Sequence, residues 1–365
     1  MKNSFGQSIT VTLFGESHSP YIGAVVDSFA PGVIVDEEVI RAALGKRRPR
    51  GAGETQRRES DEFRIVSGAV GGRTTGTPLC LLIPNTDVKS EDYESFSSLA
   101  RPSHADFTAE AKYHGFQDKR GGGHFSGRLT AALVAVGAIA RQMLGQKGVY
   151  LGTHVLSLGG VRDVKFTDAE REVKDIASMD FPVLSPVEDE MLSRVEEARK
   201  DGDSVGGVTE TAIVGLEPGL GEPWFDSIES VLSHALFSIG GIKGVQFGAG
   251  FAFGEMNGSE ANDAFYVGGG KIKTKTNNNG GVNGGITNGM PIIFSCAVKP
   301  TPSISKEQDT VDYVKGENAR IRISGRHDPA IIRRVCPVID AVCALTIADM
   351  LAARYGTDYF CGAKK

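Results

Sequence analysis

The stretch "RGGGHFSGRLTAALVAVGAIARQML", residues 120–144, places three glycines and several basic residues directly before the longest apolar run of the chain. Alanine and leucine are strong helix formers, so the segment from Leu129 to Leu144 predicts a helix. Its apolar part ends at Arg141, which makes it too short to cross a bilayer. We therefore expect a helix that is buried inside the protein.

The segments around this helix predict strands that come in groups. Strands are expected at residues 8–15, 79–84, 207–216 and 290–300. Further helices are expected at 188–202, at 226–240 and from Pro337 onward, the second opened by a capping box of Asp226 and Glu229. Since strands and helices do not alternate strictly, the pattern favours an α+β fold over a doubly wound parallel sheet. We expect one interwoven domain over residues 1–365.

Composition indicates a globular protein of a reducing compartment. Apolar residues make up 40% of the chain and charged residues 23%, which is ordinary for a globular protein. The five cysteines contain no CxxC pair, and their odd number does not suit a secreted disulfide framework. Asn3, Gln7 and Glu16 interrupt any apolar leader, so we expect a cytoplasmic protein without membrane contact. No group of His, Cys, Asp or Glu has the spacing of a metal site.

A basic run at residues 45–58, "GKRRPRGAGETQRR", contrasts with the net charge of −5. It indicates either a pocket for anionic ligands or a nucleic-acid surface. Arginine suits a pocket, because its guanidinium pairs with phosphate and carboxylate through two parallel hydrogen bonds. A nucleic-acid binder is expected to have a broad basic face, whereas these cations are confined to one short segment. The pocket is favoured, and its cations are Lys46, Arg47, Arg48, Arg50, Arg57 and Arg58.

Glycine gives a second indication of a ligand site, since 47 of the 365 residues are glycine. In "RGGGHFSGR" the glycines leave backbone N–H groups open at a helix start, where Arg120, His124 and Arg128 add positive charge. This combination predicts an anion site, and a glycine turn before a buried helix is the alternative. The segment matches neither a Walker A loop nor a GxGxxG fingerprint.

Three short motifs carry groups that can move protons. "FGESHSP" places Ser17 and His18 on opposite sides of an extended chain, so His18 is a candidate acid or base by itself. "ARPSHADF" sets His104 two residues before Asp106, which could orient the imidazole or cap the next helix. "GRHDP" gathers three polar residues, Asp328 among them, at a turn. Capping and turn-forming roles are the alternatives for these groups.

Two further loops are candidates for contacts with a phosphate or a larger ligand. "VKPTPSIS", residues 298–305, carries Lys299 out of a strand towards two hydroxyl groups, or is merely stiffened by proline. "NNNGGVNGGITNG", residues 277–289, is rich in residues that tolerate left-handed backbone. It is either a hairpin tip or a loop moulded against a ligand.

Taken in order, these motifs resemble the motif series of the chorismate synthase family, from about Gly6 to the C-terminal helix. The resemblance implies a β-α-β sandwich with helices packed between antiparallel sheets, assembled as a homotetramer. It implies a lyase of the shikimate pathway of aromatic amino acid biosynthesis. This enzyme eliminates phosphate from 5-enolpyruvylshikimate 3-phosphate in a 1,4-anti sense to give chorismate, with reduced FMN (FMNH2) as cofactor. The matching segments are "FGESH", "QRRES", "TTGTPL", "NTDVKSEDY", "RPSHAD", "KRGGGHFSGR", "GLGEPWFDS", "SIGGIKGVQFG", "GGVNGGITNG", "VKPTPS" and "GRHDP".

The resemblance also assigns roles to single residues. His18 and His104 match histidines that transfer protons, and Asp328 matches an aspartate at the flavin edge. Ser17 and Ser126 match serines near these groups. Four arginines match or lie nearest to residues that bind the substrate or NADP: Arg47, Arg48, Arg50 and Arg128. Flavin contacts fall on His124, Phe125, Ser126, Gly240, Gly241, Gly284, Lys299, Pro300, Thr301, Pro302, Ser303 and Arg326.

The chain departs from the family pattern at the glycine-rich segment. Many members have "GGGRSS", whereas His124 and Phe125 here replace an arginine and a serine, so side-chain contacts differ while backbone contacts need not. The resemblance leaves the flavin reductant open between NADPH acting on this chain and a separate flavin reductase. The chain has no additional dinucleotide signature, which favours the outside reductant. Competing classes are a flavodoxin-like electron carrier, which would need βαβ alternation, and a non-enzymatic nucleic-acid binder.

Overall fold

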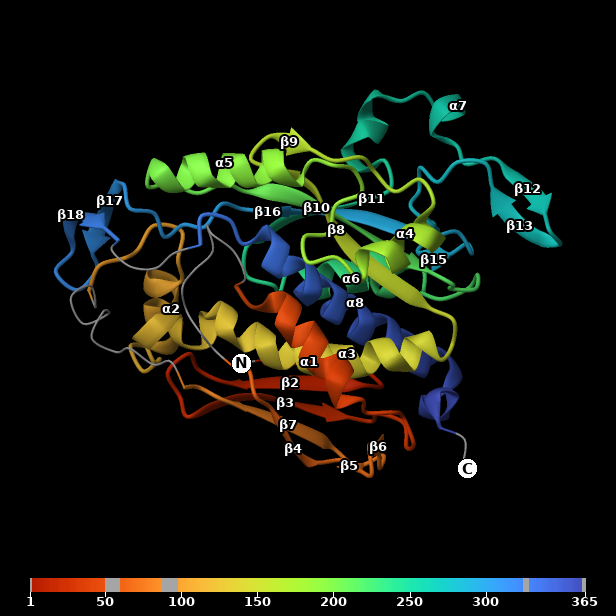
Figure 1. Ribbon diagram of the computed structural model, residues 1–365, viewed down its shortest axis with the longest axis horizontal. Coiled ribbons are helices and arrows are strands. Elements are labelled where there is room, and N and C mark those ends of the chain that lie inside the picture. The colour runs from red at the N-terminus through yellow and green to blue at the C-terminus, as the bar shows by residue number, and fades with distance from the viewer. Residues whose placement is uncertain (1, 50–59, 87–97, 324–327, 363–365) are drawn as a thin grey trace.

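Two five-stranded antiparallel sheets enclose a layer of helices (Figure 1). The computed structural model describes residues 2–49, 60–86, 98–323 and 328–362. The first sheet has the order β1 (Ser4–Phe5), β2 (Thr10–Gly15), β3 (Tyr21–Asp27), β7 (Leu79–Pro84) and β4 (Arg64–Ser67). The second has the order β11 (Ile242–Phe247), β16 (Ile292–Val298), β10 (Gly207–Val214), β8 (Tyr150–Leu158) and β9 (Val161–Arg162). The predicted α+β sandwich is confirmed, and so are the strands expected in these segments.

The helix layer between the sheets is made by α3 (Thr130–Gly145) and α8 (Ile332–Tyr355). Both helices are apolar on nearly every side, as helices packed within a protein core must be. They touch at Gly137, where an added Cβ would lie only 2.6 Å from the Cα of Ala341. Helix α8 has the length and composition of a membrane span, but 94% of its most apolar window is buried inside the protein. It is the central core helix of this fold.

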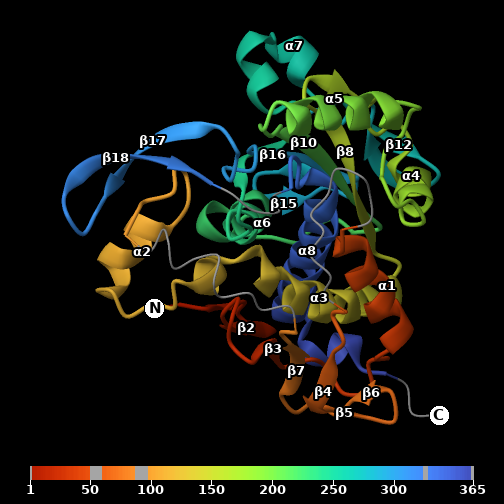
Figure 2. The same cartoon turned by 60° about the vertical axis from the view of Figure 1, so that its left-hand side comes forward.

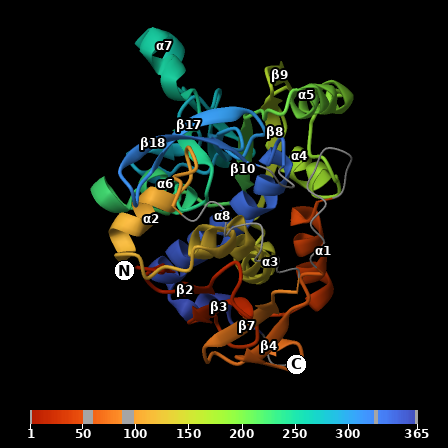
Figure 3. The same cartoon turned by 90° about the vertical axis from the view of Figure 1, so that its left-hand side faces the viewer.

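The remaining helices cover this core. Helix α1 (Glu37–Arg47) packs on α3, and α6 (Ile228–Leu236) packs on α8. Helices α4 (Ala169–Ile176) and α5 (Glu188–Lys200) lie on the outer face of the second sheet (Figure 2). At one side of the molecule, α2 (Asp106–Tyr113) lies beside the hairpin β17 (Glu307–Asp312) and β18 (Glu317–Arg322) (Figures 2 and 3).

Short elements complete the chain. A hairpin of β12 (Phe265–Gly268) and β13 (Lys271–Thr274) projects from the side opposite β17 and β18, together with α7 (Gly258–Ala261) (Figure 1). Two small two-stranded sheets pair β5 (Ala69–Val70) with β6 (Arg73–Thr74) and β14 (Val282–Asn283) with β15 (Ile286–Thr287). The 3-10 helices are η2 (Arg120–Phe125), η3 (Gly127–Leu129), η4 (Trp224–Asp226), η5 (Gly250–Glu255) and η6 (Thr357–Phe360).

Two predicted helix starts are wrong. Helix α6 is capped by Ser227, whose hydroxyl accepts from the Ser230 amide at 3.1 Å, because Asp226 is taken up in η4. Helix α8 begins at Ile332, so Pro337 lies inside it instead of at its start. The added first turn is held from outside, because Arg333 donates to the carbonyls of Lys46 and Arg48 at the end of α1. These tertiary bonds compensate for the amide hydrogen that proline lacks.

Candidate active site

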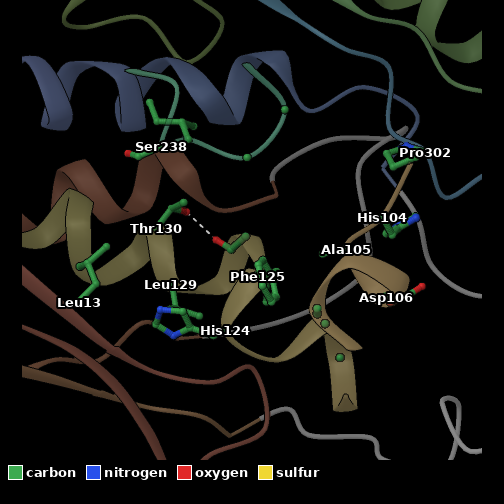
Figure 4. A pocket seen from close by; sticks show the side chains of 18 of the residues that line it. Leu13, His104, Ala105, Asp106, His124, Phe125, Leu129, Thr130, Ser238 and Pro302 are labelled. Carbon is green, nitrogen blue, oxygen red and sulfur yellow. Dashed lines mark hydrogen bonds between the residues drawn. The ribbon is translucent and has the colours of Figure 1, made fainter. Parts of the chain in front are cut away.

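A cavity of about 1190 Å³ opens where the first sheet, α2, η2 and the loop after β16 meet (Figure 4). One part of its wall is apolar, with Leu13, Leu129 and Leu133 among its residues. In the view of Figure 4, His104 and Pro302 stand at one end, Leu13 and Ser238 at the other, and Phe125 between them. Basic side chains also line the cavity, namely Lys2, Arg101, Lys119, Arg120 and Lys299. Such a lining suits a ligand with a flat apolar part and anionic groups.

His18 reaches this cavity from the turn that follows β2. The turn is fixed against the glycine run, since the Ser17 amide donates to the Gly123 carbonyl at 3.0 Å. Gly121 adopts φ +59°, and an added Cβ there would overlap the His18 ring and lie 2.7 Å from Ser17 Oγ. The glycine run is therefore needed for the histidine to pack against backbone. Among the described residues, the buried Ser17 hydroxyl has no hydrogen-bond partner.

The two residues that depart from the family pattern both line the cavity. The Nδ1 atom of His124 lies 2.8 Å from the Gly15 carbonyl, so this imidazole ties the glycine run to the end of β2. Phe125 is half exposed and packs edge-on against Tyr113 at 6.0 Å between ring centroids. Ser126 accepts from the Arg128 amide at 3.2 Å and caps η3. His124 and Phe125 thus both add an aromatic ring to the lining of the cavity.

His104 is held in one neutral form. Its Nδ1 lies 3.0 Å from the Pro102 carbonyl, which can only accept, so Nδ1 carries the hydrogen. Its Nε2 is then the acceptor for the Ser303 hydroxyl at 2.9 Å. Burial, followed by the positive charge of Arg101, lowers the pKa of His104 to about 4. Asp106 does not orient this imidazole; it forms an ion pair with Arg101 at 2.7 Å.

The loop after β16 brings cationic and hydroxyl groups to the same wall. Lys299 donates to the Ser103 carbonyl at 2.8 Å, and burial, with Lys243 nearby, lowers the pKa of its ammonium group. The hydroxyl of Thr301 is buried and has no hydrogen-bond partner in the described part of the chain. Gly240 lies on this cavity with open space where a Cβ would stand. Predicted flavin residues that the structure brings to the cavity are His124, Phe125, Ser126, Gly240, Gly241, Lys299, Pro300, Thr301, Pro302 and Ser303.

The described part of the basic run, residues 45–49, is not among the residues that line the cavity. Arg47 and Arg48 each lie 3.5 Å from Asp61 Oδ2, and Arg128 pairs with Asp61 Oδ1. The Asp61 side chain is fully buried, and Arg48 alone of these three arginines is substantially exposed, at 36% of its side chain. We call these four residues the Asp61 cluster. None of its members is among the residues that line the cavity.

Other predicted residues fall elsewhere. Asp328 forms an ion pair with Arg334 at the start of α8 and does not line the cavity. Gly284 lies in the turn between β14 and β15, with φ +62°, also outside the cavity lining. Arg50 and Arg326 lie outside the described residues. The described residues contain no group of three or more His, Cys, Asp or Glu that could hold a metal ion.

Sequence reasoning missed three cations of the cavity, Lys2, Arg101 and Lys119. Lys119 pairs with Glu110 at 2.8 Å, and its ammonium group lies 5.6 Å from the Tyr313 ring centroid. The proximity of Arg101 to a predicted histidine was a usable signal. Lys119 stands directly before Arg120 in the segment "KRGGGHFSGR", which was likewise a usable signal, whereas its contact with Tyr313 comes from far along the chain.

Both the fold and the site define the chain as an α+β sandwich protein with a large cavity that is lined by basic side chains and by His18, His104, His124 and His234. The family model for chorismate synthase matches residues 9–352, and the chain belongs to the chorismate synthase family. It is 46% identical to the chorismate synthase of Aeropyrum pernix, covering 97% of this chain and 93% of the relative. It is 44% identical to that of Korarchaeum cryptofilum, covering 94% and 96%. A crystal structure of a chorismate synthase superposes with a TM-score of 0.76 at 27% identity, covering 96% of this chain and 94% of the other.

Proposed function

We propose that this cavity forms chorismate by 1,4-anti elimination of phosphate from 5-enolpyruvylshikimate 3-phosphate, with reduced FMN as cofactor. The family uses reduced FMN, and a lyase activity follows from membership. The observation that carries the proposal for the site is that His18 and His104, far apart in the sequence, line one cavity with the loop 299–303. A substrate with a phosphate and two carboxylates needs this concentration of cations.

The residues present fit a flavin mononucleotide. The unpartnered Thr301 hydroxyl, the Ser303 hydroxyl, Lys299 and the open backbone at Gly240 offer the donors that a phosphate requires. Phe125 and the apolar wall offer surface for a flat ring system. When bound, reduced FMN supplies electron density to the substrate and recovers it.

The histidines handle protons in this scheme. His18 lies beside the buried Ser17 hydroxyl and donates a proton towards the departing phosphate. His104 is neutral near pH 7, because its pKa is lowered to about 4. Its Nε2 can therefore take up a proton once the Ser303 hydroxyl hydrogen-bonds to a ligand instead. Asp328 forms an ion pair with Arg334 and assists proton transfer at the flavin edge.

Among the arginines, we assign substrate contact to Arg48 and to Arg50. The partial exposure of Arg48 supports its assignment, whereas Arg47 and Arg128 are buried against Asp61. A homotetramer is proposed for the assembly. Exposed aromatic residues support it, with Trp224 at 85%, Phe225 at 89% and Phe251 at 88% exposed. Gly284 would then contact flavin across a subunit boundary, and light scattering of the purified protein tests the assembly.

The reductant and the location are also proposals. We expect reduced flavin to come from a separate flavin reductase rather than from NADPH bound to this chain, and we expect a cytoplasmic enzyme. The decisive experiment is anaerobic phosphate release from the substrate with chemically reduced FMN, with and without NADPH. Release with reduced FMN alone supports both proposals for function and reductant. No release under either condition contradicts the proposed reaction.

A further inference from the structure

The side chain of Asn85 binds the turn that carries His18. This residue follows β7, and its Nδ2 donates to the Glu16 carbonyl at 3.1 Å and to the Ser19 carbonyl at 2.7 Å. Its backbone amide also donates to the Pro20 carbonyl at 3.1 Å. Asn85 therefore binds carbonyl groups on both sides of His18 and restrains the turn as a unit.

Asn85 is in turn oriented by Arg128. Its Oδ1 accepts from Arg128 Nε at 2.9 Å, and Arg128 also donates to the Pro84 carbonyl at 3.2 Å. A guanidinium can only donate and a backbone carbonyl can only accept, so the Asn85 amide fits in one orientation alone. The buried carboxylate of Asp61 completes the chain by pairing with Arg128. No exposed group takes part in it.

We propose that Asp61, Arg128 and Asn85 form a positioning network that fixes His18 for proton transfer. The opposite side of the turn is already closed by the glycine run, through the Ser17 amide and the close approach of Gly121. His18 thus lies between the backbone of the glycine run on one side and the buried hydrogen-bonded network of Asp61, Arg128 and Asn85 on the other. The inference rests on the proposed role of His18.

The network matters for the reaction rate, because small displacements of a catalytic group lower that rate. A shift of about 1 Å in a reacting group lowers rates by about 10²-fold. A turn held only by its own backbone bonds, such as Ser19 to Glu16 at 3.2 Å, would sample such shifts. Anchoring it to a buried ion pair removes this freedom without placing another charge in the cavity.

The test is Asn85→Asp, which keeps the shape and the acceptor for Arg128 but replaces both donors to the turn by an acceptor. We expect kcat to fall by about 10- to 100-fold while the KM for the substrate changes by less than about threefold. The matched control is Asn257→Asp, the same change at the exposed N-cap of α7, where both residues cap equally well. Its kcat should be unchanged. A wild-type kcat in Asn85→Asp overturns the inference.

A double variant separates this inference from the role of His18. If the network acts through His18, Asn85→Asp should cost nothing further in a His18→Ala background, as measured by single-turnover phosphate release. Full additivity overturns the inference even if each single variant is slow. If His18→Ala turns over at the wild-type rate, the proposed role of His18 is wrong, whatever Asn85→Asp does.

A second variant, Arg128→Lys, tests the network independently in case Asn85→Asp folds poorly. Arg128→Lys keeps the charge facing Asp61 but offers no planar fork to reach Asn85 and Pro84 together. We expect its kcat to fall by about tenfold and hydrogen exchange of the Ser17 amide to become faster. A wild-type exchange rate and a wild-type kcat in Arg128→Lys would contradict the network.

Discussion

The cavity and the Asp61 cluster both gather basic side chains, but they use them differently. In the Asp61 cluster three arginines face one fully buried carboxylate that comes from a separate segment of the chain. At the cavity, Arg101 and Arg120 pair with carboxylates only five and two residues away, Asp106 and Asp118, and they remain beside open space. The difference teaches that a dense run of cations in a sequence marks a charge requirement, while the partner that meets it is set by the fold.

The largest expected effect is on stability, at the Asp61 cluster. Asp61→Ala should lower the free energy of unfolding by about 3–5 kcal/mol, because it leaves buried arginines without their carboxylate. Chemical denaturation measures this change. Glu196→Ala is the control, since it removes an exposed ion pair with Arg199 on α5 and should leave the midpoint unchanged. A loss at Asp61 no greater than that of the control would show that the cluster is not structural.

At the cavity the corresponding effect is on rate. His18→Ala and His104→Ala should each lower turnover by roughly 10²-fold or more, the usual contribution of a positioned acid or base. The thermal midpoint should move far less than in Asp61→Ala, and binding of FMN with substrate should persist. Near-normal turnover in both variants would contradict the proton-transfer assignment.

A smaller effect is expected at Arg48, the partly exposed member of the Asp61 cluster. Arg48→Ala should raise the KM for the substrate by about tenfold, since a charge-assisted hydrogen bond contributes about 1.5–3 kcal/mol. Arg48→Lys should rescue it only in part, because the bidentate fork is lost. Arg47→Lys serves as comparison and should affect stability more than KM. An unchanged KM in Arg48→Ala would place this residue with the structural arginines.

Near pH 7 the smallest expected effect is the contribution of His104 to stability, and this contribution grows as the pH falls. The unfolded chain takes up a proton at His104 near pH 6.5, whereas the folded protein does so only near pH 4, because burial and Arg101 lower the pKa. Between these values the unfolded state binds more protons, so stability should fall as the pH falls from 6.5 to 4. Subtracting the pH profile of His104→Gln from that of the wild type isolates this effect. Equal profiles would mean that His104 titrates normally.

Much of the site followed from local sequence. The glycine run could be predicted to lie close to another group, and the structure places Gly121 against His18 and Ser17. The loop 299–303 was likewise marked by its hydroxyls and its lysine, and all five residues line the cavity. In both cases the chemistry lies within a few neighbouring residues.

The start of α8 and the role of Asp61 could not be predicted from the sequence. Pro337 is a strong local signal for a helix start, but Arg333 finds its partners on α1 and extends the helix by a turn. Asp61 is a single aspartate in a polar segment, and nothing near it in the chain shows that it will be fully buried.

The sequence by itself determined the grouping of strands, the buried helices, the family and the cavity residues of the glycine run and of the loop 299–303, because these depend on local periodicity and on motifs that keep their order. Only the tertiary structure decided which cations face the cavity and which face Asp61. The reason is physical: a buried charge is stable only beside a partner, and that partner can lie anywhere in the chain. Arg128 stands within the most telling motif of the sequence, yet its partners Asp61 and Asn85 come from two other segments.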